Sequence, residues 1–230
     1  PLQSDMQLVW GEPAKIFCHD QKSNKNALPI GSPRHDKFFN HKKIPSKPII
    51  LFAPTGTTSF SCEHSTTKTI LDFYEIVKNT CKIASKISSK ELVMKPHPST
   101  TVSNEVIHIA KEIDSKIKIT FTTNILDLIN ECELLITTNN STIAVEAMML
   151  GKPVISLQTE NWSLQEDIAI SNAIVSITDT SELKNSIEKI LFDEKYRTDL
   201  LNNSKKFLDK HFSNPGDASK NIYKILTQII

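Results

Sequence analysis

The sequence contains few cysteines, and they lie far apart. Cys18, Cys62, Cys81 and Cys132 form no CxxC pair, so neither a disulfide framework nor a zinc site is expected. Free thiols are typical of the reducing cytosol, where we expect the protein to be located. The sequence also lacks any apolar run of the roughly 18–20 residues that a membrane-spanning helix needs, and no signal peptide is visible.

An excess of charge of either sign is also missing. The 27 basic and 26 acidic residues give a formal net charge of +1, which gives no support for nucleic acid as a partner. Hydrophobic residues make up 39% and charged residues 23% of the 230, which is ordinary for a globular protein with a buried core. A peripheral membrane contact and a homodimer both stay open.

The sequence begins Pro1-Leu2-Gln3 instead of with Met. We therefore expect a fragment or a processed product. Residues 1–45 are expected to be a connecting segment from a missing or truncated N-terminal domain, and residues 46–230 to form the main domain.

From residue 48 onward, short apolar runs alternate with segments that carry apolar residues at helical spacing. This alternation predicts an α/β fold with a Rossmann-like parallel sheet, helices on both faces, and a helical C-terminal tail that starts near residue 180. Strands are predicted at 48–53, 91–95, 117–121, 134–136, 154–157 and 173–177. Helices between them are predicted at 66–88, 102–113, 125–132 and 142–150.

Three polar motifs follow predicted strands directly. They are Pro54-Thr-Gly-Thr-Thr58, Lys95-Pro-His-Pro98 and Thr138-Asn-Asn-Ser-Thr142. In a parallel sheet, ligands bind outside the carboxyl ends of the strands. The three motifs therefore mark the edge of the sheet where a ligand site is expected.

The motif at 138–142 leads into a predicted helix, whose N-terminal N–H groups and positive dipole end can hold a pyrophosphate without a metal. The alternative is that Asn140 or Ser141 only caps the helix. Glu146 follows one turn later in an apolar stretch, where a carboxylate needs partners such as the hydroxyls of a sugar. A solvated helix face is the alternative for Glu146.

The other two motifs offer different groups. His97 lies between two prolines that fix the backbone, and it can hydrogen-bond a phosphate or a leaving diphosphate; a structural or exposed His is the alternative. Gly56 permits close approach of the backbone to a ligand, but the loop is neither a Walker A motif nor GxGxxG. The sequence contains no DxD motif, so metal-dependent transfer is not indicated.

Taken together, these segments resemble the C-terminal nucleotide-binding domain of GT-B enzymes. The resemblance is to the group of UDP-N-acetylglucosamine 2-epimerases, CDP-glycerol glycerophosphotransferases and capsular polysaccharide transferases, and it covers roughly residues 7–230. It is carried by residues 31–36, 50–55, 95–98, 137–140 and 146–155.

The resemblance implies roles for individual residues. His97 would be the catalytic residue and would contact the donor phosphate or ribose, while Glu146 would bind ribose hydroxyls. No metal and no cofactor other than the donor itself is implied. The substrate-binding residues would be Thr55, Gly56, Thr57, Thr58, Lys95, Asn139, Asn140, Ser141, Thr142 and Glu146.

The chain departs from the epimerase pattern at two places. Epimerases have Asp-Ser-Gly-Gly where this chain has residues 139–142, and a second acidic residue where it has Val145. These departures favour the donor-binding part of a transferase that uses a UDP- or CDP-activated sugar or glycerol for surface polysaccharide or glycoconjugate synthesis. The N-terminal domain of the same protein would be its partner. An epimerase-like isomerase and a non-catalytic nucleotide-binding or scaffold module are the alternatives.

Overall fold

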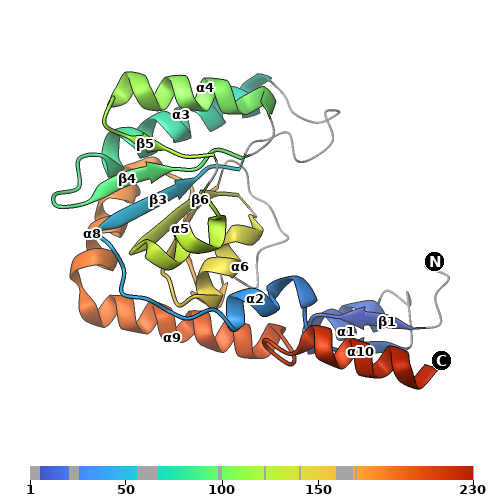
Figure 1. Ribbon diagram of the computed structural model, residues 1–230. Coiled ribbons are helices and arrows are strands. Elements are labelled where there is room, and N and C mark those ends of the chain that lie inside the picture. Colours follow the sequence, from blue (N-terminus) through green and yellow to red (C-terminus); the bar gives the residue numbers. More distant parts are fainter. Residues whose placement is uncertain are drawn as a thin grey trace. The chain divides into compact units, whose positions relative to one another are not determined.

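The computed structural model (Figure 1) describes residues 6–20, 26–55, 67–97, 100–121, 123–139, 141–158, 168 and 170–229. The chain forms two compact units. We call Lys43–Ser204 the sheet unit, and Pro1–Lys42 together with Lys205–Ile230 the terminal unit.

The sheet unit is built on a parallel sheet. Six strands pair in the order β5-β4-β3-β6-β7-β8, and each pair is parallel. The predicted α/β fold with a parallel sheet is therefore confirmed. The strands are β3 (Ile49–Ala53), β4 (Glu91–Met94), β5 (Lys118–Ile119), β6 (Leu134–Thr138), β7 (Val154–Leu157) and β8 (Val175–Ile177).

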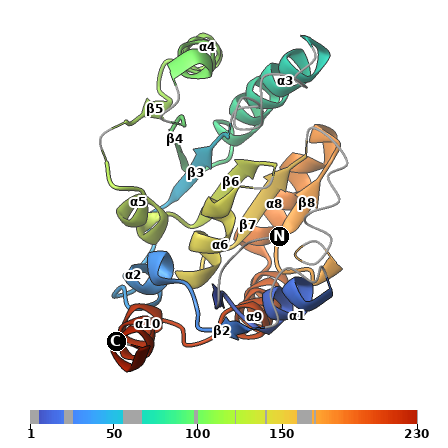
Figure 2. The ribbon, with the colours of Figure 1, turned by 90° about the vertical axis from the view of Figure 1, so that its right-hand side faces the viewer.

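Helices cover both faces of this sheet. Figures 1 and 2 show α3 and α8 on one face and α5 and α6 on the other. Alternate strand residues supply the two cores: Ile50 and Phe52 pack in the cluster that contains α3, α4 and α8, while Leu51 between them is buried on the opposite face. The helices are α3 (Thr67–Ala84), α4 (Thr100–Ile113), α5 (Ile125–Glu131), α6 (Thr142–Met149), η4 (Thr180–Glu182) and α8 (Leu183–Phe192).

The strand order reverses between β3 and β6. The chain runs from β3 outward through β4 to β5, then returns to β6 and runs outward through β7 to β8. Such a reversal is the topological switch point, where open α/β sheets bind ligands. Two of the predicted motifs follow the two strands that meet there.

Three of the predicted strands differ from the observed ones by two residues at one end, and two others differ by a single residue. β6 continues through Thr137 and Thr138, which the sequence pattern assigned to a loop, because Thr137 pairs with β3 and β7 and Thr138 pairs with β7. β5 is shorter than predicted and ends at Ile119, where pairing with β4 stops. β8 begins at Val175 instead of residue 173.

The terminal unit contains a small parallel sheet that the connecting segment was not expected to form. β1 and β2 pair in parallel, and α1 lies between them in the chain. Val9, Cys18 and Ala27 form a small core with Ala14. The elements are β1 (Gln7–Val9), α1 (Glu12–Asp20), β2 (Ala27–Pro29), η1 (Pro33–His35), α2 (Asp36–Phe39) and α10 (Ala218–Ile229), while α9 (Glu194–His211) begins in the sheet unit.

The segment that carries the Gly31–Asp36 motif packs against residues 211–219. Gly31 has φ +97°, and a Cβ there would lie 2.2 Å from the carbonyl oxygen of Ser213, so only glycine fits. The carboxylate of Asp36 accepts hydrogen bonds from the backbone N–H groups of Ala218 (3.0 Å) and Ser219 (2.8 Å) at the start of α10. The motif therefore has a structural role within the terminal unit.

Candidate functional site at the carboxyl ends of the strands

The ends of β3 and β6 are tied together by threonine hydroxyls. Thr138 Oγ1 accepts a hydrogen bond from the N–H of Thr55 (2.8 Å) and donates one to the carbonyl oxygen of the same residue (2.9 Å). Thr137 Oγ1 donates to the carbonyl oxygen of Ala53 (2.9 Å). The backbone after β3 is thus held at the switch point by side chains of β6.

The turn after β6 is anchored to β7. Asn139 has φ +50°, a left-handed conformation that Asn tolerates better than most residues. Its N–H donates to the carbonyl oxygen of Leu157 (2.8 Å), and its own carbonyl oxygen accepts from Ser156 Oγ (2.9 Å) and from the N–H of Ser141 (3.0 Å). Asn140 lies outside the described residues. This turn places the start of α6 at the carboxyl edge of the sheet.

The start of α6 is the part of the edge best suited to an anion. Its N-cap residue, Ser141, has extended backbone, and its side chain makes no capping hydrogen bond. The alternative in which Ser141 serves as an ordinary side-chain cap is therefore not what the structure shows. Thr142, the first helical residue, is exposed. The backbone N–H groups and the dipole of α6 point toward this edge, where a negative charge would be stabilised.

Glu146 lies one turn into α6 and is buried. The alternative of a solvated helix face is therefore wrong. Its neighbours Ala144, Ala147 and Met148 are buried as well. Glu146 makes an interaction within the chain, which fits the requirement that a buried carboxylate have partners. Its proposed contact with ribose hydroxyls stays a prediction.

The residues that follow β4 lie at the same carboxyl end of the sheet, on the other side of β3 from β6. The N–H of Lys95 donates to the carbonyl oxygen of Phe52 (2.9 Å), and its Nζ donates to the carbonyl oxygen of Phe121 (3.0 Å). Burial lowers the pKa of Lys95. His97 is exposed and makes an interaction of its own within the chain. Because β4, β3 and β6 are neighbours, Lys95, His97, Thr55, Asn139 and Ser141 lie at the same end of the sheet.

Part of the predicted site cannot be placed. Gly56, Thr57 and Thr58 lie outside the described residues, as do Pro98 and Asn140. The described residues of the predicted site are Thr55, Lys95, His97, Asn139, Ser141, Thr142 and Glu146.

Sequence reasoning missed Ser156 and Gln158. Ser156 is buried in β7, where its hydroxyl donates to the carbonyl oxygen of Asn139 and accepts from Gln158 Nε2 (2.9 Å). A usable signal was present, because a serine inside the apolar run 154–157 needs a hydrogen-bond partner when it is buried.

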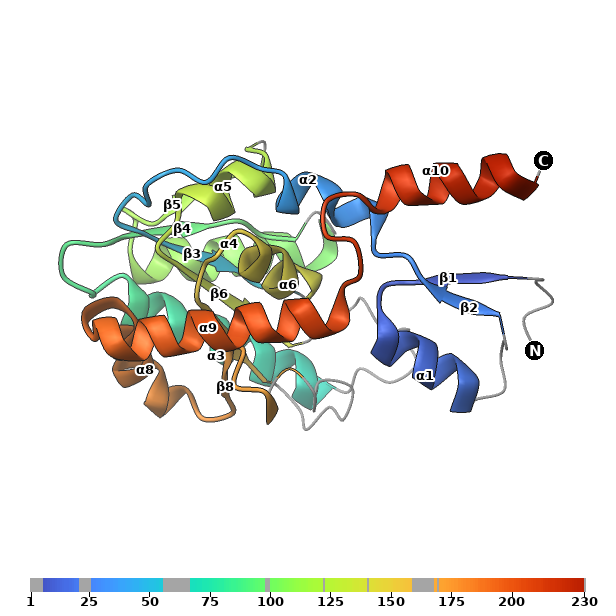
Figure 3. The same ribbon diagram turned by 90° about the horizontal axis from the view of Figure 1, so that it is seen from below.

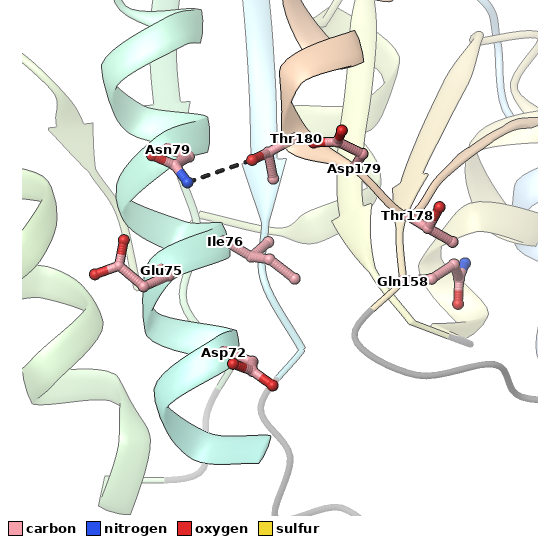
Figure 4. Close-up of a pocket in the computed structure, with 8 residues that line it drawn as sticks. All are labelled: Asp72, Glu75, Ile76, Asn79, Gln158, Thr178, Asp179 and Thr180. Carbon is pink, nitrogen blue, oxygen red and sulfur yellow. Dashed lines mark hydrogen bonds between the residues drawn. The ribbon is translucent and has the colours of Figure 1, made fainter. Parts of the chain in front are cut away.

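A polar cavity lies further along the same edge. It measures about 340 Å³ and is lined by α3 and by residues that follow β7 and β8 (Figure 4). Asn79 Nδ2 donates to Thr180 Oγ1 across it (3.3 Å). Gln158 lines this cavity and also contacts Ser156, so it connects the cavity wall to the turn after β6. None of the predicted site residues lines it.

The described residues give one observation on metal ions and one on membranes. Among them, no group of three or more His, Cys, Asp or Glu side chains is arranged to hold a metal ion. In the same part of the chain, no helix is both long enough and apolar enough to cross a membrane.

The fold is similar to part of the fold of solved GT-B enzymes. The chain is similar to S. aureus MnaA in complex with UDP (TM-score 0.68, 16% identity, 99% of this chain and 62% of that one). It is also similar to UDP-GlcNAc 2-epimerase from Neisseria meningitidis bound to UDP-GlcNAc (0.67, 15%, 98% and 62%) and to the wall teichoic acid polymerase TagF (0.59, 15%, 97% and 57%). At these identities the likeness shows the fold alone.

The family is shown by the sequence itself. Residues 3–169 match the LIC12162 family transferase, and the chain belongs to this transferase family. No curated protein matches the sequence. The chain spans 62% of the length of the first two solved structures named above.

Proposed function

We propose that the sheet unit is the donor-binding part of a metal-independent transferase with a UDP- or CDP-activated sugar or glycerol as donor. The observation that carries the proposal is the position of the start of α6. It lies at the β3/β6 switch point and has no side-chain cap from Ser141. A helix N-terminus at a switch point is suited to a diphosphate. Two solved structures with the same fold hold UDP and UDP-GlcNAc.

In the proposed reaction with a sugar donor, the bond between the anomeric carbon and the diphosphate oxygen breaks, and the nucleoside diphosphate leaves with the electron pair. With CDP-glycerol, the bridge between the two phosphates breaks instead, CMP leaves with the electron pair, and glycerol phosphate is transferred. In both cases an acceptor hydroxyl forms the new bond and gives its proton to a base or to water. The α6 amides, Ser141 and Thr142 would stabilise the charge that develops on the diphosphate, and His97 would donate a hydrogen bond to it. Glu146 would bind the ribose hydroxyls. The acceptor would be held by the N-terminal domain of the same protein, and the product would be a surface polysaccharide or glycoconjugate.

Isothermal titration of the 230-residue chain with UDP and with CDP, in the presence of EDTA, tests this site. We expect one of the two nucleotides to bind, and His97→Ala and Glu146→Gln each to weaken its binding by about tenfold or more, the loss of roughly one charge-assisted hydrogen bond. His108→Ala is the matched control, because His108 is an exposed histidine on α4 that pairs with Glu112 at 3.5 Å. Unchanged affinity in both site variants would remove these residues from the site.

An epimerase is the second candidate, because a solved epimerase shares the fold. Membership in a transferase family and the departures at residues 139–142 and Val145 favour the transferase. Interconversion of UDP-N-acetylhexosamines by the complete protein, followed by NMR, would decide for the epimerase.

A further inference from the structure

The terminal unit contains a buried histidine that the proposed transfer does not use. His35 is the last residue of η1, and its side chain is only 1% exposed. Three aromatic rings surround it, with centroids 5.4 Å (Trp10), 5.7 Å (Phe212) and 6.1 Å (Phe38) from the centroid of the imidazole. Trp10 and Phe212 also stack on each other at 5.4 Å. We call these three rings the aromatic cage of His35.

One of the two ring nitrogens of His35 has a hydrogen-bond partner. Nδ1 lies 2.8 Å from Oγ of Ser32, which is buried as well. Nε2 is buried, and no described residue forms a hydrogen bond with it. The hydroxyl of Ser32 suits Nδ1 in either neutral tautomer, because a hydroxyl both donates and accepts. In the imidazolium both nitrogens carry a proton, and the proton on Nε2 would point at no acceptor among the described residues. The cage is therefore suited to the neutral form.

The charges close to His35 also disfavour its protonation. Burial lowers the pKa of His35 below its ordinary value of 6.5, and the positive charges of Arg34 and Lys37 lower it further. The negative charge of Asp36 has a smaller, opposite effect on this pKa. Burial without a partner and a cationic neighbourhood therefore act in the same direction.

The other segments of the cage place titratable groups beside its rings in the chain. Glu12 follows Trp10 by two residues, is 59% exposed and lies 3.7 Å from Lys15. His211 directly precedes Phe212, and its Nδ1 lies 2.9 Å from the carbonyl oxygen of Phe207. His211 is thus a second histidine close to the cage, and an experiment on His35 has to separate the two.

The cage lies where two distant stretches of the chain meet. The N–H of Ser213, next to Phe212, donates to the carbonyl oxygen of Trp10 (2.8 Å). Asn40 Nδ2 donates to the carbonyl oxygen of Gly216 (2.7 Å). The carboxylate of Asp36, next to His35, accepts from the first N–H groups of α10. Figure 3 shows α2 beside the turn that leads into α10. The start of α10 is therefore held by residues that surround the cage.

We propose that His35 is a pH-sensitive latch that holds the start of α10 to the segment 31–40. While the imidazole is neutral, the aromatic cage is closed and the contacts to residues 213–219 are made. When the imidazole takes a proton from mildly acidic solvent, the cation leaves the cage, these contacts open, and α10 detaches. This proposal goes beyond the proposed transferase and does not depend on it.

The direction of the pH effect follows from proton binding in the two states. Between the lowered pKa of His35 and 6.5, an open cage binds more protons at this residue than a closed cage does. Opening therefore becomes more favourable as the pH falls below 6.5, by up to about tenfold for each pH unit. At pH 5.0 the equilibrium constant for opening should exceed its value at pH 7.5 by up to about thirtyfold.

Hydrogen exchange of the 230-residue chain at pH 7.5 and 5.0, corrected for the intrinsic pH dependence of exchange, tests the latch. We expect the protection of amides in residues 213–225 to fall by at least about fivefold at pH 5.0. In His35→Leu, whose apolar side chain fills the cage and does not titrate, protection should change by less than about twofold. His211→Gln is the matched control and should keep the pH dependence of the natural chain.

The fluorescence of Trp10 gives a second measurement that does not need a variant of the cage. Trp162→Phe removes the other tryptophan of the chain, so the emission then reports on Trp10 alone. We expect a reversible change in this emission with a midpoint below pH 6.5, absent in His35→Leu.

Three results would overturn the latch. Protection of residues 213–225 and Trp10 emission that do not change between pH 7.5 and 5.0 would show that the cage stays closed. The same pH dependence in His35→Leu would assign the effect to another group, and its loss in His211→Gln would assign it to His211. Higher protection at pH 5.0 would mean that the aromatic faces stabilise the cation.

Discussion

The amino ends and the carboxyl ends of the strands in the sheet unit both carry polar side chains, and they satisfy them in different ways. At the amino ends, Lys90 pairs with Glu133, and Lys47 pairs with Glu131 at 2.7 Å. At the carboxyl ends, the hydroxyl of Thr138 bonds to the backbone of Thr55.

The polar side chains at the amino ends stabilise the fold, whereas those at the carboxyl ends are arranged in a way that suits a ligand. The charges of Lys90 and Lys47 at the amino ends are matched by opposite charges from neighbouring segments of the chain. The carboxyl ends instead hold a helix start and small side chains in fixed positions, which is what the binding of a diphosphate requires. We therefore expect substitutions at the carboxyl ends of the strands to affect nucleotide binding. Substitutions at the amino ends should affect stability alone.

The largest effect should come from Thr138→Val, which preserves the shape of the side chain and removes its hydroxyl. The N–H and the carbonyl oxygen of Thr55 both lose a partner, so the free energy of unfolding should fall by about 2 kcal/mol. Nucleotide affinity should fall as well, because the backbone after β3 is no longer held at the switch point. Urea denaturation and titration calorimetry measure the two effects. If Thr138→Val lowered stability but left nucleotide affinity unchanged, the hydrogen bonds between Thr138 and Thr55 would not contribute to the ligand site.

A smaller effect is expected for Lys152→Met at the amino edge. Lys152 is buried, and its Nζ donates to Ser46 Oγ (2.7 Å). Burial, together with the charges of Arg197 and Lys43, lowers the pKa of Lys152 below its ordinary value of 10.5. Replacing such a buried charge by an apolar side chain should leave the protein as stable or stabilise it by about 1 kcal/mol at pH 7.

The lowered pKa of Lys152 determines how the stability of the natural chain changes with pH. Between that pKa and 10.5 the unfolded chain binds more protons at Lys152 than the native protein does, so the stability of the natural chain rises with pH. The advantage of the Met variant should shrink as the pH approaches 10.5, as urea denaturation at several pH values would show. A loss of more than about 2 kcal/mol at pH 7 would mean that the ammonium group has a required partner.

The smallest change in stability is expected for Ser141→Ala. A side-chain cap contributes about 1 kcal/mol, but Ser141 makes no such bond, so the free energy of unfolding should change by less than about 0.5 kcal/mol. Nucleotide affinity should still fall severalfold if the hydroxyl meets a phosphate. If Ser141→Ala lowered the free energy of unfolding by about 1 kcal/mol and left nucleotide affinity unchanged, Ser141 would be a helix cap.

Much of the sheet unit could be predicted from local pattern. Apolar runs such as 49–53 and 154–157 are buried on both faces, so their composition alone indicates central parallel strands. The end of β6 was less predictable, because Thr137 and Thr138 look like loop residues in the sequence. Only the structure shows that their hydroxyls bond to backbone groups at the end of β3 and just after it. The burial of Glu146 was also undecided, since a short helix pattern does not reveal which sides are covered.

The terminal unit was the least predictable region. β1 and β2 have three residues each, which is too short for a periodic signal. Gly31 and Asp36 were recognised as part of a motif, but their structural partners lie more than 180 residues later in the chain. No local pattern records a contact of that separation.

By itself, then, the sequence determined the alternation of strands and helices and the polar motifs that follow the strands. It did so because hydrophobic periodicity and turn residues act over a few positions. Only the tertiary structure decided the strand order, and with it the meeting of Thr55 and Thr138 at the switch point. It also decided that Glu146 and His35 are buried, because both depend on which distant segments pack together.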